Sequence, residues 1–85
     1  SVGSRSLADS YLQVGAYSTR TAAQDVAATL KTLTREPVRI EKIRSAQGRE
    51  LHRVRIGPLR EVQSIDEIKR RVAAANLGTP YTVNE

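Results

Sequence analysis

The chain has 85 residues and a formal net charge of +5, from 14 basic and nine acidic side chains, and it contains no cysteine. This length allows one domain with a modest core, and the lack of cysteine excludes a disulfide framework and a thiolate metal site. No apolar run approaches the roughly 20 residues of a membrane span, and no segment resembles a signal peptide. We expect one domain, residues 10–85, without membrane insertion, preceded by a linker or expression remnant at residues 1–9.

The positive charge is concentrated in one segment. Seven basic and two acidic residues lie between Arg39 and Arg60, so this segment alone accounts for the net charge of the chain. A one-sided cationic patch favours an anionic partner, such as nucleic acid, anionic lipid or an acidic glycan. The alternative is that the arginines are solvated side chains that protect the strands of a sheet.

Residues 11–18 read Tyr-Leu-Gln-Val-Gly-Ala-Tyr-Ser, and their alternation predicts a strand with one buried face. The residues expected to face the core are Leu12, Val14 and Ala16. The residues expected to face outward are Tyr11, Gln13, Gly15 and Tyr17.

A second strand is predicted at residues 51–57, where Val54 and Ile56 share one face and Arg53 and Arg55 the other. Two such strands side by side at the centre of a sheet would combine their outward residues into one polar floor. We expect the protein to work at that floor.

An apolar stripe at helical spacing follows the first strand, and it consists of Ala22, Ala23, Val26, Ala27, Leu30 and Leu33. Ser18 or Thr19 can cap the start of this helix, and Pro37 should end it near Arg35. A strand from residue 38 to about residue 44 comes next. Ile43 is out of register in that strand, so either a bulge turns it inward or it lies on the outward face.

The polar, glycine-containing residues 45–50 predict a hairpin loop, and Gly57-Pro58 should end the strand that follows. Ser64-Ile-Asp-Glu67 has the pattern of a capping box that opens a second helix, with Gly78 as its stop. The stripe of this helix consists of Ile65, Ile68, Val72 and Ala75. A last strand is predicted at residues 80–84, with Tyr81 and Val83 inward and Thr82 outward.

The order of elements is βαββαβ, which predicts an α+β fold of the ferredoxin-like or RNP-like type. Right-handed crossovers and the central hairpin give a four-stranded antiparallel sheet in the order 4-1-3-2, with two helices on one face. The other face is expected to be open. This architecture hosts many functions, so the fold alone assigns none.

No set of residues assembles a nucleophile with a base, so we expect a non-enzyme without cofactor or metal. The single histidine, His52, shares its face with Val54 and Ile56 and is expected at the rim of the core. RNA-recognition sheets stack bases on aromatic residues of their two central strands. Residues 52–57 lack that aromatic pattern, and we therefore expect no nucleic-acid partner. An RNA-binding or protein-interaction domain of the same fold remains the alternative function.

Three features together resemble the SPOR (sporulation-related repeat) domain: the strand at residues 11–18, a helix of Ala-x-x-x-Ala-x-x-Leu character, and Arg-Val-Arg-Ile-Gly-Pro-Leu at residues 53–59. The resemblance extends from Tyr11 to Asn84. The resemblance is greatest to the C-terminal SPOR domain of an outer-membrane lipoprotein. The lytic transglycosylase activity of that lipoprotein lies in a separate domain.

The resemblance implies a βαββαβ domain that binds peptidoglycan glycan strands stripped of their stem peptides. It implies that a monomeric domain brings its parent protein to sites of wall remodelling, notably the division septum. It also implies a location in the bacterial periplasm, with a tether to the outer membrane through the parent lipoprotein.

The resemblance also assigns residues to the glycan. The family's binding glutamine falls on Gln13, its third-strand arginine on Arg53, and the large residue two positions before that arginine on Leu51. The fourth-strand contact falls on Thr82. The family commonly has serine where this chain has Ala16, which removes one hydrogen bond.

Three neighbouring residues are candidates to replace that serine, and they are Tyr17, Ser18 and Thr19. The full set of expected glycan-binding residues is Gln13, Gly15, Ala16, Tyr17, Ser18, Thr19, Leu51, Arg53, Arg55 and Thr82.

Overall fold

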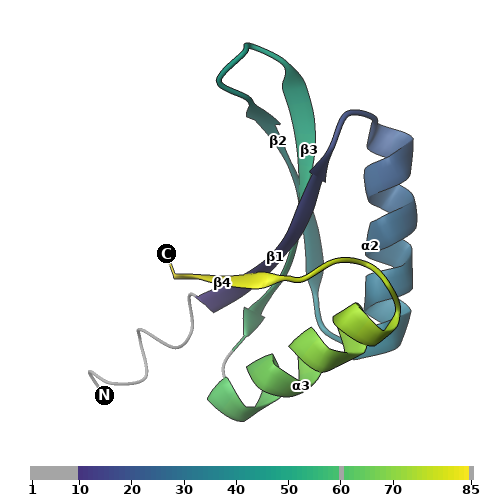
Figure 1. The fold of residues 1–85 in the computed structure, drawn as a ribbon, viewed down its shortest axis with the longest axis vertical. Helices are drawn as coiled ribbons and strands as arrows, with labels where there is room; N and C mark the ends of the chain where they lie inside the picture. The colour runs from purple at the N-terminus through teal and green to yellow at the C-terminus, as the bar shows by residue number, and fades with distance from the viewer. Residues whose placement is uncertain (1–9, 60, 85) are drawn as a thin grey trace.

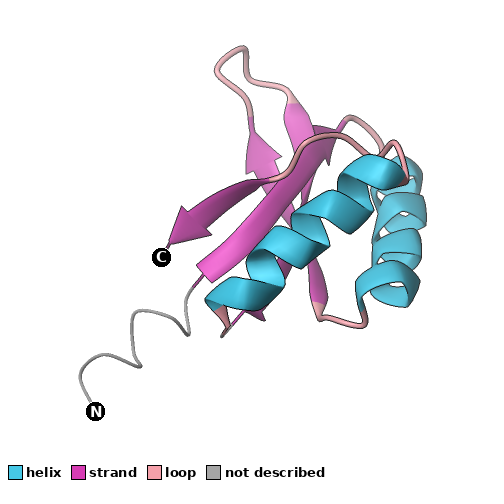
Figure 2. Cartoon of the chain, turned by 60° about the horizontal axis from the view of Figure 1, so that its bottom comes forward, coloured by secondary structure: helices cyan, strands magenta, loops and turns pink. Residues whose placement is uncertain are grey.

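The computed structural model describes residues 10–59 and 61–84, which form a four-stranded antiparallel sheet with two helices packed on one of its faces (Figures 1 and 2). The elements are β1 (Ser10–Tyr17), α2 (Arg20–Thr34), β2 (Val38–Arg44), β3 (Glu50–Leu59), α3 (Val62–Ala74) and β4 (Tyr81–Asn84). The strand order β2-β3-β1-β4 is the predicted order counted from the other edge, so the α+β fold is confirmed. The expected linker, residues 1–9, lies outside the described residues.

The core lies between the central strands and the two helices. Leu12 of β1 is opposite Ile56 of β3, and both side chains are fully buried, as is Val54. The helices contribute Ala23, Ala27, Leu30, Ile68 and Val72 to the same cluster. Their spacing in the sequence is the one that places a single stripe of each helix against the sheet. Within the described residues, no helix combines the length and apolarity that crossing a bilayer requires.

Helix α2 begins and ends as predicted. Thr19 is the N-cap, and its Oγ1 accepts a hydrogen bond of 3.1 Å from the backbone N–H of Ala22. At the other end Arg35 adopts a left-handed conformation with φ 61°, and Pro37 follows two residues later. The polypeptide thereby reverses direction and enters β2 at the edge of the sheet.

Helix α3 begins three residues earlier than predicted, and the capping box is wrong. Glu61 is the N-cap, and the backbone N–H of Ser64 already bonds to the carbonyl of Glu61 within the first turn. Ser64 therefore lies inside the helix and cannot cap it. The helix also stops before Gly78, because Asn76 takes the left-handed conformation at φ 60° and the N–H of Leu77 bonds back to the carbonyl of Val72.

Strand β3 continues through Gly57-Pro58 to Leu59, so the expected stop at this dipeptide is wrong. The strand continues because the Gly57 N–H donates to the carbonyl of Pro37 at 2.8 Å, and because the pairing with β1 shifts register at this point. Gly57 has φ 139°, a conformation in which an added Cβ would lie 2.9 Å from Cδ2 of Tyr11. Any other residue would be strained at this φ and would crowd the Tyr11 ring, which is why glycine suits this position.

A β-bulge in β1 changes which residues share a face. Gln13 is opposite Arg55 and Gly15 is opposite Val54, so Val14 is an extra residue on β1. The alternation of side chains shifts by one position after this point. Ala16 consequently faces outward, where it is exposed, and not toward the core as predicted.

The bulge also turns Tyr17 inward, so its expected place on the outward face is wrong. Tyr17 lies opposite His52 and packs against the core cluster, and His52 itself is buried at the rim as expected. Strand β4 shows a second reversed pattern. Tyr81 is opposite Gln13 and exposed, whereas Thr82 is opposite the buried Leu12. The preceding residue, Pro80, is buried and takes the inward position that the sequence pattern gave to Tyr81.

Candidate functional site

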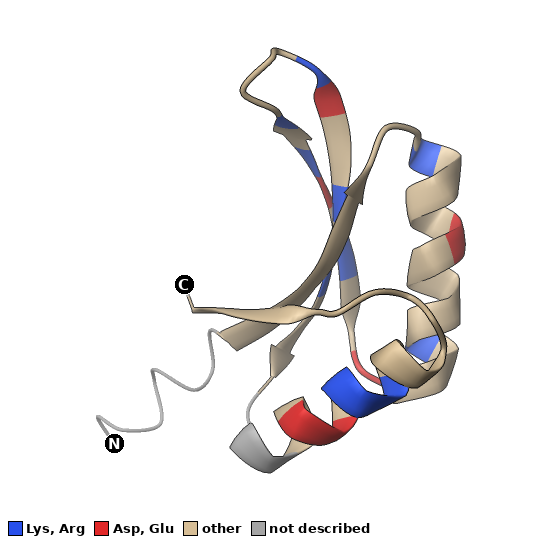
Figure 3. Ribbon diagram, viewed as in Figure 1, with Lys and Arg blue, Asp and Glu red and all other residues tan. Residues whose placement is uncertain are grey.

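The sheet surface turned away from the helices is called here the open face (Figure 2). Its residues follow from the strand register, because directly opposed residues of paired strands point to the same side. They are Tyr11, Gln13, Ala16, Arg39, Glu41, Ile43, Leu51, Arg53, Arg55, Tyr81 and Val83. Positive charge on this sheet is confined to β2 and β3, since β1 and β4 carry no charged residue (Figure 3).

The charged centre of the open face consists of two arginines of β3 and one glutamate of β2. The Nη2 of Arg53 donates to Oε1 of Glu41 at 2.7 Å, and the Nη1 of Arg55 lies 3.5 Å from the same oxygen. The Arg53 side chain is 23% exposed and that of Glu41 is 40% exposed, whereas Arg55 is almost fully covered at 4%. Of the two arginines, Arg53 is therefore the one that a ligand can reach directly.

The ring of Tyr11 lies against two guanidinium groups. The Cζ atoms of Arg39 and Arg55 are 5.8 and 5.5 Å from its centroid, within the range of cation–π attraction. Arg39 and Arg55 are also directly opposite one another in the β2–β3 ladder, where like charges repel. The Tyr11 ring and the Glu41 carboxylate offset this repulsion and keep Arg55 in place beneath the surface.

Glu41 carries a perturbed carboxyl group. The hydrogen bond from Arg53 lowers the pKa of Glu41 below its ordinary value of 4.5, and the charges of Arg53, Arg55 and Arg39 act in the same direction. Partial burial works against this but does not reverse it. Glu41 is therefore ionised at neutral pH, and its negative charge sits among three arginines.

Beside this centre, the Nε2 of Gln13 donates to the hydroxyl oxygen of Tyr81 at 2.6 Å. Tyr81 is 55% exposed, so its ring is presented to solvent next to the amide of Gln13. The alternation of β4 residues did not indicate Tyr81 as a site residue, because it placed Tyr81 inward. The available signal was Pro80, because an apolar residue in the inward position makes its neighbour face outward.

Three other candidates surround the centre. Ala16 lies opposite Arg53, so its methyl group adjoins the guanidinium-bearing side chain. Ser18 and Thr19 lie in the exposed turn after β1, and the Thr19 hydroxyl is engaged in capping α2. Of the residues proposed to replace the family's serine, Ser18 is the one whose hydroxyl is exposed and not occupied by that cap.

An apolar pair, Ile43 and Leu51, lies at the hairpin end of the open face. The two residues are directly opposite one another and are half-buried. The β2–β3 register runs without a shift from Val38 to Arg44, so Ile43 takes the outward position, the second of the two alternatives left open by the sequence. The pair extends the open face beyond Arg53 with a surface suited to apolar contact.

Three predicted site residues lie apart from this group, toward the helix side of the sheet. Tyr17 packs on the core, and Thr82 has the register of the buried Leu12. An ideal Cβ built on Gly15 would lie 2.9 Å from the hydroxyl oxygen of Tyr17. Gly15 thus makes room for the Tyr17 ring, in place of the bare patch on the open face that the sequence pattern predicted.

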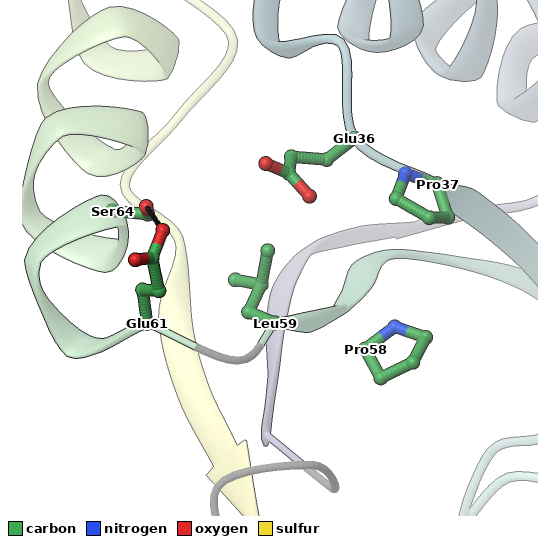
Figure 4. A pocket seen from close by; sticks show the side chains of 6 residues that line it. All are labelled: Glu36, Pro37, Pro58, Leu59, Glu61 and Ser64. Atoms are coloured by element: carbon green, nitrogen blue, oxygen red, sulfur yellow. Dashed lines mark hydrogen bonds between the residues drawn. The ribbon is translucent and has the colours of Figure 1, made fainter.

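A separate cavity of about 250 Å³ lies where β2 begins, β3 ends and α3 begins (Figure 4). Its lining residues are Glu36, Pro37, Pro58, Leu59, Glu61 and Ser64. None of them belongs to the open face. Within residues 10–59 and 61–84, no three acidic or histidine side chains form a group that could hold a metal ion.

Comparison with known proteins defines the class of this domain. The profile of the SPOR domain family matches residues 7–82. The chain belongs to the SPOR domain family, as the resemblance of its strands predicted.

The individual relatives agree with this assignment. Endolytic peptidoglycan transglycosylase RlpA from two strains of Pseudomonas aeruginosa is 38% identical to the chain over 73 residues, which are 86% of the chain but 21% of RlpA. The crystal structure of the RlpA SPOR domain from Pseudomonas aeruginosa superposes with a TM-score of 0.82 and 37% identity, covering 89% of this chain and 99% of that domain.

A putative exported protein from Burkholderia pseudomallei shares the fold at a TM-score of 0.59 and 21% identity, over 88% of this chain and 15% of its own.

The chain spans about a fifth of the length of RlpA, the curated relative that it matches. It is a binding domain and not an enzyme, and it is related to a protein of the cell envelope. This confirms the expectation of a non-enzyme.

Proposed function

We propose that this domain binds peptidoglycan glycan strands that lack stem peptides, and that it thereby brings its parent protein to sites of wall remodelling such as the division septum. The observation that carries the proposal is the position of the bonded pair Gln13 and Tyr81 on the open face of a SPOR domain, the same face that presents Arg53. The relationship to a peptidoglycan transglycosylase supports the choice of polymer.

The chemistry of the open face supports a sugar polymer. Sugar rings offer apolar faces and a rim of hydroxyl and N-acetyl groups, so their site needs a ring or apolar platform with polar groups beside it. The exposed ring of Tyr81 has an apolar body and a polar end. The amide of Gln13 can donate and accept hydrogen bonds, and the Ile43–Leu51 pair offers a second apolar surface.

The preference for a stripped strand has a chemical reason. In intact peptidoglycan the lactyl group of substituted N-acetylmuramic acid is tied up as an amide to the stem peptide. Removal of the peptide exposes a carboxylate and removes bulk that would hold the strand off the sheet. Arg53 is then the carboxylate partner, through charge-assisted hydrogen bonds, and the covered Arg55 supplies electrostatic support.

The same relationship supports a proposal about the parent protein. Because the chain matches about a fifth of RlpA, we propose that it serves as a monomeric targeting module of a larger envelope lipoprotein tethered to the outer membrane. The remaining predicted contacts, Gly15, Tyr17 and Thr82, belong to this proposal with less geometric support, because they lie toward the helix side.

RNA binding is the competing function, since the open face is cationic and carries two tyrosines. The Tyr11 ring is already engaged by two arginines, and β3 contains no aromatic residue, so a stacking platform on both central strands is lacking. RNA is therefore the alternative ligand that a binding experiment must distinguish from glycan.

Calorimetric titration of the wild type and Arg53→Gln with stripped glycan oligomers and with chito-oligosaccharides of equal length tests the proposal. The wild type should prefer the stripped glycan, and Arg53→Gln should lose roughly ten- to a hundredfold in affinity for it, as expected for a charged hydrogen bond. If the wild type binds both sugars equally, Arg53 does not recognise the lactyl carboxylate. The preference for stripped over intact glycan would then come from steric exclusion of the stem peptide alone. Tight binding of single-stranded RNA at physiological salt, without glycan binding, would contradict the proposal.

A further inference from the structure

The carboxylate of Glu41 occupies the position at which an anionic ligand would meet the arginines of the open face. Its Oε1 accepts a 2.7 Å hydrogen bond from Nη2 of Arg53 and lies 3.5 Å from Nη1 of Arg55. A carboxylate between two guanidinium groups has the charge and the geometry expected of a bound acidic sugar.

Glu41 fills this position incompletely. The Nε of Arg53 is buried and has no hydrogen-bond partner among the described residues, although it lies on the same edge of the guanidinium as the engaged Nη2. A ligand carboxylate that displaced Glu41 could use both nitrogen atoms of that edge in a bidentate pair. The exchange would leave Glu41 in solvent, which its 40% exposure allows.

We propose that Glu41 is a specificity-determining residue, an internal counter-ion that a ligand carboxylate must displace from Arg53 and that keeps densely charged polyanions off the open face. Among the charged residues of the open face, Glu41 is the single anion and Arg39, Arg53 and Arg55 are the cations. With Glu41 present, the arginines attract a polymer with widely spaced carboxylates and are poorly matched to a polyphosphate. The inference rests on the proposed function for the identity of the natural ligand.

The matched variants are Glu41→Gln and Glu50→Gln. Both raise the net charge of the domain by one, but Glu50 pairs with Lys42 at 3.7 Å in the exposed hairpin, in a register that faces the helix side of the sheet. Each variant is titrated with oligouridylate at several salt concentrations and with the stripped glycan. Thermal unfolding of each variant verifies that it is folded.

Glu41→Gln should bind oligouridylate roughly tenfold more tightly than the wild type, with a salt dependence steeper by about one unit in the slope of log affinity against log salt. Glu50→Gln should change this affinity by less than about threefold, because screening weakens a distant charge. Glu41→Asp, which keeps the charge, should behave like the wild type. If Glu41→Gln gains no more than Glu50→Gln does, the assignment is overturned whatever the glycan does.

The glycan arm separates this inference from the proposed function. A wild type that does not bind stripped glycan, together with a selective gain of Glu41→Gln for oligouridylate, would refute the proposed function and support the role of Glu41. Should Glu41→Gln not fold, carbon NMR of the wild-type Glu41 carboxyl group still decides. Saturation with stripped glycan should raise the pKa of Glu41, because the hydrogen bond from Arg53 is lost. An unchanged pKa would show that no exchange takes place.

Discussion

Gln13 and Tyr81 are joined by a hydrogen bond of 2.6 Å between neighbouring strands, β1 at the centre of the sheet and β4 at its edge. The bond holds the amide of Gln13 beside an exposed aromatic ring, and both lie on the same face as Arg53. A hydrogen-bonding group, a ring and a guanidinium can together bind a carboxylated sugar, the proposed ligand, and residues 68 positions apart in the sequence supply the first two.

Tyr81→Ala should reduce affinity for stripped glycan by roughly tenfold or more, because it removes the exposed ring. Tyr81→Phe keeps the ring and loses only the bond to Gln13, so its loss should be smaller. Both variants should stay within about 0.5 kcal/mol of the wild type in the free energy of unfolding. Thr82→Ala is the comparison, since Thr82 has the register of the helix side and its loss should cost less affinity than the loss of Tyr81. A loss of binding for Thr82→Ala without one for Tyr81→Ala would show that the face of β4 is misassigned.

Ala16→Ser should strengthen glycan binding several-fold, because it restores a hydroxyl group directly opposite Arg53, where the family commonly has serine. One additional neutral hydrogen bond contributes about 1 kcal/mol. Ala28→Ser, on the exposed surface of α2, controls for the added hydroxyl. Titration with stripped glycan compares these two variants with the wild type. If Ala16→Ser binds the glycan no better than Ala28→Ser does, a hydroxyl group at position 16 does not contact the glycan.

The bulge at Val14 explains why part of the site was predictable from sequence and part was not. Strict alternation places Gln13 and Ala16 on opposite faces, and the bulge brings them to the same one. The family resemblance assigns both positions to the ligand. Two residues three positions apart can share a face of a strand only if the strand contains a bulge between them. Gly15 was the local signal, since an isolated glycine within a strand often marks a bulge. Tyr17 was predicted on the wrong face because the regular alternation was continued past the bulge.

Val54→Ala should destabilise the domain by roughly 1–3 kcal/mol, because Val54 is fully buried at the centre of the core. Its glycan affinity, measured well below the unfolding temperature, should be unchanged. Gln13→Ala should do the opposite, with weakened binding and an unfolding free energy within about 0.5 kcal/mol of the wild type. Chemical denaturation and titration of the two variants separate the faces of the sheet. An unfolded Gln13→Ala domain would mean that the faces are inverted.

The stability of the domain should fall at acidic pH, in part through Glu41. Its pKa is lowered from 4.5 in the folded state, chiefly by the hydrogen bond from Arg53. Such a group contributes stability that is fully present above the unfolded pKa and is lost as the pH falls through the folded pKa. Below about pH 4.5, the melting temperature of the wild type should therefore decline more steeply than that of Glu41→Gln. Identical pH profiles for the two proteins would show that the ion pair does not contribute.

The helices and the strand order could be predicted because each helix buries one apolar stripe and each crossover is right-handed. The ends of elements were less predictable. Helix α3 begins after Glu61 and not after Ser64, where the capping pattern predicted its start. Strand β3 does not end at Gly57, because the Gly57 N–H donates a hydrogen bond to the carbonyl of Pro37. The contact of Tyr81 with Gln13 and the role of Glu41 depend on strand register, which the sequence specifies only through residues far apart in the chain.

Retention on purified sacculi, before and after an amidase removes the stem peptides, tests the central claim most directly. The wild-type domain should be retained by amidase-treated sacculi and much less by untreated ones, and Gln13→Ala should be retained less than the wild type by the treated material. Equal retention of the wild-type domain by treated and untreated sacculi would contradict recognition of the stripped strand.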